Sequence, residues 1–398
     1  MAATGNGKTG ASGEGEGRSG GEVRAAWIEA ARLRTLPLAA SGSFIAAGLA
    51  AATGAFRVEV FALMFVVSIL LQVIANFADD YGDLAHGLDD ETRVGPKRGM
   101  QRGIITPPQM RRALIGACTV TFALGCILIY VAFTGSPALG AGAVTAMAVF
   151  LVLGIAAIAA AVLYTVGPHP YGYLGLGDVM SFLFFGIVAV VAGSFLYVHQ
   201  VTAASVVAAL ALGLPVAAVM NINNMRDSLA DAAKGKRTIA NRLYAAGERR
   251  GSQLVEGKKP EEIAAIAAVL EHGPRVDGKK VDEQLKRGGA EAVARATDPA
   301  RVAALMGEVN MRTYHKALVI ISQMLFIVAG VLVFGPSAPA VWLTVAITFA
   351  AIPLRRATDG VVRQLDHTKL DRFMAPTSLG TVLVALVFSV GVAIAAAL

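Results

Sequence analysis

Residues 75–83 read Ala75-Asn76-Phe77-Ala78-Asp79-Asp80-Tyr81-Gly82-Asp83, and they close an apolar run that begins near residue 59. At helical spacing, Asp79 and Asp83 are four residues apart and Asp80 and Asp83 are three apart, so the carboxylates are neighbours on one side of a helix. Like charges this close repel each other unless something cationic lies between them. The stretch therefore predicts a membrane helix whose polar end has a function.

A second stretch of the same kind occurs later in the chain. Residues 223–231 read Asn223-Asn224-Met225-Arg226-Asp227-Ser228-Leu229-Ala230-Asp231, again at the end of an apolar run. Asp227 and Asp231 are four residues apart and share a helix face. If the two acidic helix ends face each other, they form an oxygen-rich site suited to Mg²⁺ and a phosphate group.

Composition places the chain in the membrane. Of its 398 residues, 55% are hydrophobic and 16% are charged, whereas soluble domains carry about 25% charged residues. The apolar residues form continuous blocks without the alternation that a β-barrel needs. We expect an all-α polytopic membrane protein with nine transmembrane helices in a bundle, at residues 36–55, 59–78, 109–134, 138–165, 179–198, 202–222, 315–335, 338–354 and 378–397.

Basic residues predict the orientation of this bundle. All but one of the 35 Lys and Arg residues fall in or beside the segments on one side of the predicted membrane, and the exception is Arg57. The positive-inside rule then places the N-terminus and both acidic stretches in the cytoplasm and the C-terminus outside, in a multi-pass protein of the cell membrane. The net charge of +7 reflects these loops. We expect no nucleic-acid partner, because no basic folded domain or recognition motif is present.

The chain divides into four regions. Residues 1–26 are expected to be a disordered cytoplasmic tail, since they are rich in Gly, Ser and Glu. Residues 27–243 hold the first six transmembrane helices with both acidic motifs, and residues 307–398 hold the last three. Residues 244–306 form a polar cytoplasmic insert, partly helical at 260–271 and 281–295. The insert has too few large apolar residues to predict a core of its own.

Cations flank both acidic motifs. Arg93, Lys97 and Arg98 follow the first, and Lys236 and Arg237 follow the second. Carboxylates interleaved with Lys and Arg predict a metal ion together with an anionic phosphate group. At a membrane boundary, a diphosphate with an apolar tail is an isoprenoid diphosphate. Metal and cationic side chains would neutralise the leaving diphosphate, and an aromatic face such as that of Tyr81 or Tyr164 would stabilise the carbocation.

These residues carry a resemblance to the UbiA superfamily of membrane prenyltransferases, which has nine transmembrane helices and two Asp-rich motifs. The chain is most similar to the branch that prenylates 1,4-dihydroxy-2-naphthoate in menaquinone synthesis. The matching stretches are Asp79 to Asp83 with Arg93 to Gln101, Tyr164 to Asp178 with Phe184-Phe185-Gly186, Asn221 to Thr238, Gly307 to His315, and Ala31 to Pro37.

The resemblance implies a UbiA-type fold, Mg²⁺ as cofactor, and two substrates, polyprenyl diphosphate and 1,4-dihydroxy-2-naphthoate. The prenyl group would replace the carboxyl group of the acceptor, with loss of CO₂ and diphosphate. By the resemblance, the catalytic and metal-binding residues would be Asp80, Asp83, Asp227 and Asp231. The substrate-binding residues would be Asn76, Asp79, Tyr81, Arg93, Lys97, Arg98, Asn223, Asn224, Lys236, Arg237 and Tyr164, with Arg34 for the acceptor carboxylate.

Two departures and two alternatives accompany this interpretation. The family usually has Asn where this chain has Asp79, and it lacks the insert 244–306. A different aromatic acceptor, such as 4-hydroxybenzoate or homogentisate, is one alternative, because acceptor choice depends on the shape of the pocket. A cation transporter with intramembrane carboxylates is the other, and it would leave the Lys and Arg companions of each motif unexplained.

Overall fold

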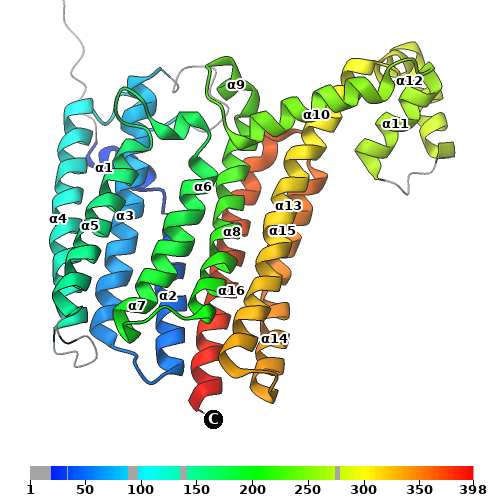
Figure 1. Ribbon diagram of the computed structural model, residues 1–398. Helices are drawn as coiled ribbons and strands as arrows, with labels where there is room; N and C mark the ends of the chain where they lie inside the picture. The colour runs from blue at the N-terminus through cyan, green and yellow to red at the C-terminus, as the bar shows by residue number, and fades with distance from the viewer. Residues whose placement is uncertain are drawn as a thin grey trace, which may run out of the picture.

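Helices account for every regular element in the part of the chain that the computed structural model describes. This part is residues 19–397 except 34, 88–96, 135–139, 141 and 274–277. The helices form one bundle, with a helical extension projecting from one end (Figure 1). The predicted class of all-α polytopic membrane protein is confirmed.

The bundle begins with α1 (Gly20–Ala31), α2 (Leu36–Ala52), α3 (Val58–Ala85), α4 (Pro107–Phe133) and α5 (Gly142–Leu163). A separate short turn, η1 (Tyr171–Leu174), comes next. The following span is continuous and consists of α6 (Gly177–Ser181), the π-helix η2 (Phe182–Ala192) and α7 (Gly193–Val198). It is followed by α8 (Ala203–Arg226) and α9 (Ser228–Ala233). The remaining elements are α10 (Ile239–Val255), α11 (Pro260–His272), α12 (Gly278–Ala296), α13 (Pro299–Phe334), α14 (Ala338–Ala350), α15 (Ile352–Arg363), η3 (His367–Phe373) and α16 (Met374–Ala397).

The number of membrane spans agrees with the sequence. Within the described residues, 7 helices are long and apolar enough to cross a membrane, and the number rises to 9 if each of two bent pairs is one span. The bent pairs are α1 with α2 and α14 with α15. The nine predicted blocks coincide with these elements, and nine spans is compatible with the structure.

Burial separates the central helix from the lipid-facing ones. In α8, 61% of the most apolar window is buried inside the protein, whereas the value for α5 is 6%. The outward side chains of α5 and α14, such as Val144 and Trp342, are exposed and apolar, as expected where lipid replaces water. α8 therefore lies at the centre of the bundle, where it packs against η2, α13 and α16.

Small residues allow the inner helices to approach closely. A Cβ on Gly48 of α2 would lie 2.6 Å from Cα of Ser389 on α16, and one on Gly186 of η2 would lie 2.7 Å from the carbonyl oxygen of Ala209 on α8. In membranes such contacts supply much of the attraction between helices, because lipid tails are as apolar as the side chains.

The boundary of the N-terminal tail differs from the sequence prediction. The N-terminal tail was expected to extend to residue 26, but α1 begins at Gly20, capped by the Ser19 side chain. The buried residues Ala26 and Ala30 of α1 pack against Met100 and Ile105. This contact fixes α1 against the segment that follows α3. Residues 1–18 lie outside the described part.

The insert 244–306 is more ordered than its composition predicted. It is built from most of α10, from α11 and α12, and from the first turns of α13, and it forms the extension in Figure 1. The expected absence of a core is wrong, because Val255, Ile263, Ala267, Val302 and Leu305 form a small buried apolar cluster. The cluster needs few large side chains, since α10 and α13 cross closely at Gly247 and Gly307.

The close crossing of α10 and α13 predicts that a methyl group added at Gly247 lowers the stability of the protein. A Cβ on Gly247 would lie 2.5 Å from the carbonyl oxygen of Met306 and 2.6 Å from Cα of Gly307. We expect Gly247→Ala to destabilise the protein by about 1–3 kcal/mol through overpacking, measured as a lower unfolding temperature in nanodiscs. Gly116→Ala is the control, because a Cβ on Gly116 of α4 meets nothing within 4 Å. Equal unfolding temperatures for the two variants would contradict the crossing.

Candidate active site

The first acidic motif lies at the end of α3, where its carboxylates are buried and paired with arginines. Asp80 is 1% exposed and Asp83 is 8% exposed. Asp80 Oδ1 lies 2.9 Å from Arg32 Nη2 and 3.0 Å from Arg98 Nη1. Arg98 Nη1 also lies 3.2 Å from Asp83 Oδ2, and Arg32 Nη1 donates to Asp79 Oδ2 at 2.9 Å. Three carboxylates on one helix end are thus held together by two guanidinium groups.

Arg32 reaches this site from an unusual backbone conformation. It ends α1 with φ 51°, a left-handed geometry that is uncommon for a residue other than glycine. The Asn76 side chain holds this turn by donating from Nδ2 to the carbonyl oxygen of Ala31 at 2.9 Å. Asn76 also accepts from Gln72 Nε2 at 3.0 Å. Asn76, predicted to bind substrate, instead positions the segment that carries Arg32.

The second acidic motif lies where α8 ends and α9 begins. Arg226 grips Asp227 with two hydrogen bonds, from Nε to Oδ1 at 2.9 Å and from Nη2 to Oδ2 at 2.6 Å. Its remaining donors reach Asn223 Oδ1 at 2.8 Å and Asp371 Oδ1 at 2.6 Å. Asp371 belongs to η3, so the last part of the chain also contributes to this end of the bundle.

The two motifs meet through Tyr173 and Lys236. The Tyr173 hydroxyl donates to Asp83 Oδ1 at 3.0 Å. The Lys236 ammonium lies 5.9 Å from the centre of the Tyr173 ring and 3.1 Å from Asp231 Oδ2. One phenol therefore contacts the first motif with its hydroxyl and the cation of the second motif with its ring face.

The pKa values of Lys236 and Asp231 are shifted by carboxylates of both motifs. Burial opposes the charge of Lys236, but the carboxylates of Asp231, Asp83 and Asp79 outweigh it and raise the pKa of its ammonium. Burial raises the pKa of Asp231; Lys236 opposes this change, and the nearby carboxylates of Asp227 and Asp83 add to it. Both motifs thus share one electrostatic centre, in which an additional cation would be favourable.

Tyr164 stands beside this centre. Burial, and then the carboxylates of Asp79, Asp83 and Asp178, raise the pKa of its phenol well above the usual value. Its hydroxyl points toward the sulfur of Met220, at 3.7 Å. The structure therefore places Tyr164 near the carboxylates, and its predicted contact with substrate stays a prediction.

Other predicted residues are placed differently. Tyr81 packs with the apolar cluster of Ala26, Met100 and Ile105 under α1, because on α3 it lies about 100° around the helix from Asp80. The side chains of Lys97 and Arg237 are exposed to solvent. Arg237 contributes its backbone N–H, which donates to the carbonyl oxygen of Tyr173 at 2.9 Å.

The remaining predicted residues complete this comparison. Asn224 donates from Nδ2 to Asp178 Oδ1 at 2.8 Å and does not contact the carboxylates of its own motif. Arg34 and Arg93 lie outside the described residues, so their predicted roles have no structural counterpart here.

Sequence reasoning left three residues out of the predicted site: Arg32, Asp178 and Asp371. Arg32 and Asp371 are distant in sequence from both motifs, and only the fold brings them in. Asp178 carries a signal that could have been used, because it is an acidic residue at the start of a predicted transmembrane helix.

The donor set fits a hard divalent cation. Asp79 Oδ1 is buried and has no hydrogen-bond partner among the described residues, so an acceptor oxygen is left over at the centre. Within the same residues, no three His, Cys, Asp or Glu side chains are grouped to hold a metal by themselves. Mg²⁺ needs no such cage, because it binds through one or two carboxylates together with substrate phosphates.

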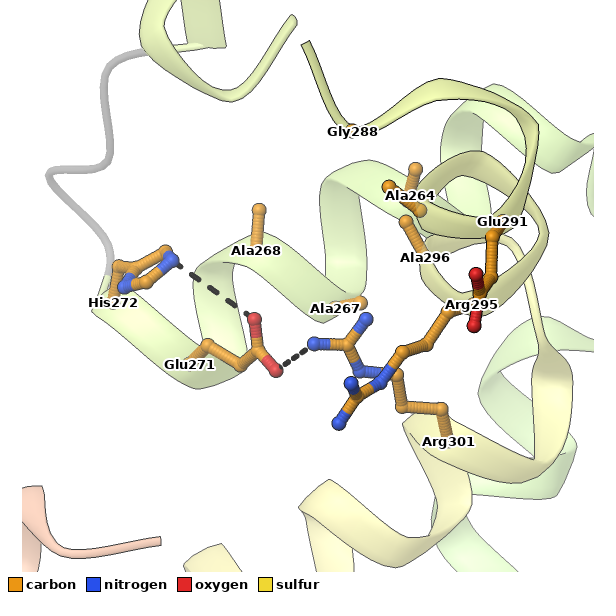
Figure 2. Close-up of a pocket in the computed structure, with 11 residues that line it drawn as sticks. Ala264, Ala267, Ala268, Glu271, His272, Gly288, Glu291, Arg295, Ala296 and Arg301 are labelled. Atoms are coloured by element: carbon orange, nitrogen blue, oxygen red, sulfur yellow. Dashed lines mark hydrogen bonds and ion pairs between the residues drawn. The ribbon is translucent and has the colours of Figure 1, made fainter. Parts of the chain in front are cut away.

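A separate pocket lies in the extension formed by the insert. It has a volume of about 460 Å³ and is lined by α11, α12 and the first turn of α13. Figure 2 shows Glu271 between His272 and Arg301, and it forms an ion pair with Arg301. Figure 1 places α11 and α12, which line the pocket, well away from α9. The pocket shares no lining residue with the site described above.

Comparison with known proteins agrees with this architecture. Residues 41–255 match the model of the UbiA prenyltransferase family. The chain is 41% identical over 226 residues to the 1,4-dihydroxy-2-naphthoate octaprenyltransferase of Escherichia coli (strain K12), which covers 56% of this chain and 70% of that protein. It is 34% identical over 247 residues to the protein of the same name from Mycobacterium tuberculosis (strain ATCC 25618 / H37Rv), covering 62% of this chain and 76% of that protein. More than half of the chain thus matches the family model, and the chain belongs to the UbiA prenyltransferase family.

Proposed function

We propose that this protein transfers a polyprenyl group from polyprenyl diphosphate to 1,4-dihydroxy-2-naphthoate. The product would be demethylmenaquinone in its reduced form, with release of CO₂ and diphosphate. The observation that carries the proposal is the meeting of Asp83, Tyr173, Lys236 and Asp231 at one end of a membrane bundle. Relatives of 41% and 34% identity, named for this acceptor, support the choice of reaction.

The side chains at the centre suit the departure of a diphosphate. Lys236 and Arg98 would contact its oxygens, because both are already held in place by buried carboxylates. Exposed Lys97 and Arg237 would attract the substrate to this end of the bundle. The carboxylates themselves cannot touch a diphosphate without a cation between them.

We propose Mg²⁺ as that cation, held by Asp80 and Asp83 from the first motif and Asp227 and Asp231 from the second. When bound, it would act as a Lewis acid that stabilises the charge on the leaving diphosphate. Asp79, in the place of the family's usual Asn, would add a further acceptor oxygen, since its Oδ1 is unpartnered.

The transfer itself balances without an added proton. The C–O bond to the diphosphate breaks, and the diphosphate keeps the electron pair. The carboxyl-bearing carbon of the acceptor then forms the new C–C bond with the allylic cation, and loss of CO₂ returns an electron pair to the ring. The bundle would shield the cation from water, which would otherwise capture it.

The orientation of the protein is part of the proposal. We place the N-terminus and the acidic centre on the cytoplasmic side of the cell membrane, because the loops at this end hold almost all the basic residues. A transporter of cations is a weaker explanation of the same carboxylates. Arg32, Arg98 and Arg226 pair with them directly. A transporter gives these arginines no role, whereas a diphosphate site needs fixed positive charge.

Product analysis tests the reaction. Purified protein in nanodiscs would receive a polyprenyl diphosphate, Mg²⁺, and one of 1,4-dihydroxy-2-naphthoate, 4-hydroxybenzoate or homogentisate. We expect a decarboxylated prenyl naphthoquinol from the first acceptor and at least tenfold less product from the others. A dominant product from another acceptor would refute the choice of 1,4-dihydroxy-2-naphthoate. The absence of any prenylated product would refute prenyl transfer altogether.

Loss of one carboxylate in either motif tests the shared centre. We expect Asp80→Asn and Asp227→Asn each to lower turnover by tenfold or more, since each removes a charge that faces the proposed cation and its arginine partners. Glu59→Gln is the control, because Glu59 is an exposed carboxylate at the other end of α3. Turnover above a tenth of wild type in a correctly inserted motif variant would speak against the role.

Metal removal tests the cofactor. We expect chelation by excess EDTA to abolish prenyl transfer and added Mg²⁺ to restore it, because the unshielded diphosphate would be repelled by the carboxylates. Full turnover in EDTA after extensive dialysis would rule out the metal.

A further inference from the structure

A second cluster of buried polar side chains lies between α6, α8 and α13. Asp178 of α6 is 2% exposed, and its Oδ1 accepts from Asn224 of α8 at 2.8 Å. The Tyr314 hydroxyl of α13 interacts with the same carboxyl group. Three helices that are far apart in sequence therefore meet at one carboxyl group inside the bundle.

Several atoms of this cluster have no partner. Among the described residues, Asp178 Oδ2 and both amide atoms of Asn221 are buried without a hydrogen bond, and the buried His315 ring interacts with the backbone of Ala218. Asn221 and His315 are fully buried. Leaving a buried polar group unpaired is unfavourable, so these three unpaired atoms on Asp178 and Asn221 need a reason.

Helix geometry places these unpaired groups together. Ala218, Asn221 and Asn224 follow each other at three-residue intervals, so each is displaced by roughly 60° around α8 from the one before. Asn224 faces Asp178 on α6, and the backbone of Ala218 faces His315 on α13. Asn221 lies between them, both along α8 and around it.

Tyr164 connects this cluster to the acidic centre. A Cβ on Gly177 would lie 2.8 Å from the Tyr164 hydroxyl, so the phenol packs directly against the residue before Asp178. The same phenol is influenced by Asp79 and Asp83 on its other side. A molecule in the cluster would therefore be adjacent to the centre that holds the diphosphate.

We propose that Asp178, Asn221 and His315 bind the hydroxyl groups of the aromatic acceptor. This inference rests on the proposed function and names the part of the site that recognises the second substrate. An arene hydroxyl donates one hydrogen bond and accepts others, which suits a carboxyl acceptor, an amide with both capacities and a neutral imidazole with both. The side chains of Asp178 and Asn221 offer hydrogen-bond acceptors and donors and carry no positive charge, so they suit the hydroxyl groups rather than the acceptor's carboxylate.

Two substitutions remove these capacities with little change in shape. Asp178→Asn keeps an acceptor for Asn224 but replaces the unpaired oxygen with a donor. Asn221→Leu removes an amide that has no partner among the described residues, so it should not destabilise the ligand-free form. If Asn221→Leu weakens binding of the acceptor while the unfolding temperature stays equal or rises, Asn221 is a binding residue. Loss of an amide with a structural role would lower that temperature.

The experiment compares two ligands and two kinetic constants. Equilibrium binding of 1,4-dihydroxy-2-naphthoate and of 2-naphthoate, which lacks the hydroxyls, would be measured on the full protein in nanodiscs, together with KM for each substrate. We expect each substitution to weaken the dihydroxy ligand by about tenfold or more, the size of a hydrogen bond to a buried polar group. Binding of 2-naphthoate and KM for the prenyl diphosphate should stay within threefold of wild type.

Ser194→Ala is the matched control, because Ser194 is also buried with an unpaired hydroxyl. It belongs to the same span as Asp178 but lies about 24 Å along it, at 1.5 Å per residue. The inference is overturned if both substitutions leave the dihydroxy ligand within twofold of wild type, or if they weaken both ligands equally. The proposed function fails by a different result, when the wild-type protein binds the acceptor but forms no prenylated product.

Discussion

The structure depends on the neutralisation of like charges at the buried ends of two helices. Asp80 and Asp83 on α3, and Asp227 and Asp231 beyond α8, are brought to one region where water is largely excluded. Carboxylates in such a place repel each other unless cations accompany them. Arg32, Arg98, Arg226 and Lys236 supply that charge. The segments that carry these cations are therefore fixed by the same interactions that assemble the site.

This requirement explains why distant parts of the chain take part. α1 ends in a left-handed turn that directs Arg32 to α3, and Asn76 of α3 holds that turn. The C-terminal η3 supplies Asp371 to Arg226. Tyr173, from the turn before α6, contacts both motifs. An acidic centre built in this way is closed from several sides, which suits a reaction through a cation that water would destroy.

The central helix α8 carries residues of both polar regions of the bundle. Its end contributes the second acidic motif, and the preceding turn carries Asn221 and Asn224 toward α6 and α13. The two polar regions are thus stacked along one helix, with Tyr164 between them. The insert, by contrast, forms its own small apolar cluster at the end of α10 and α13. Its pocket is separated from both polar regions.

The sequence by itself determined the membrane class, the positions of the spans and both acidic motifs, because long apolar runs and spaced carboxylates are local patterns. It also indicated the family, since several motifs occur in order. Only the tertiary structure decided which residues partner those carboxylates. Arg32 and Asp371 are distant in sequence from both motifs, and Tyr81 lies next to Asp80 in the chain yet packs away from it. Tertiary contacts also decided the core of the insert, because the close approach of α10 and α13 at Gly247 and Gly307 lets small residues bury what composition suggests they cannot.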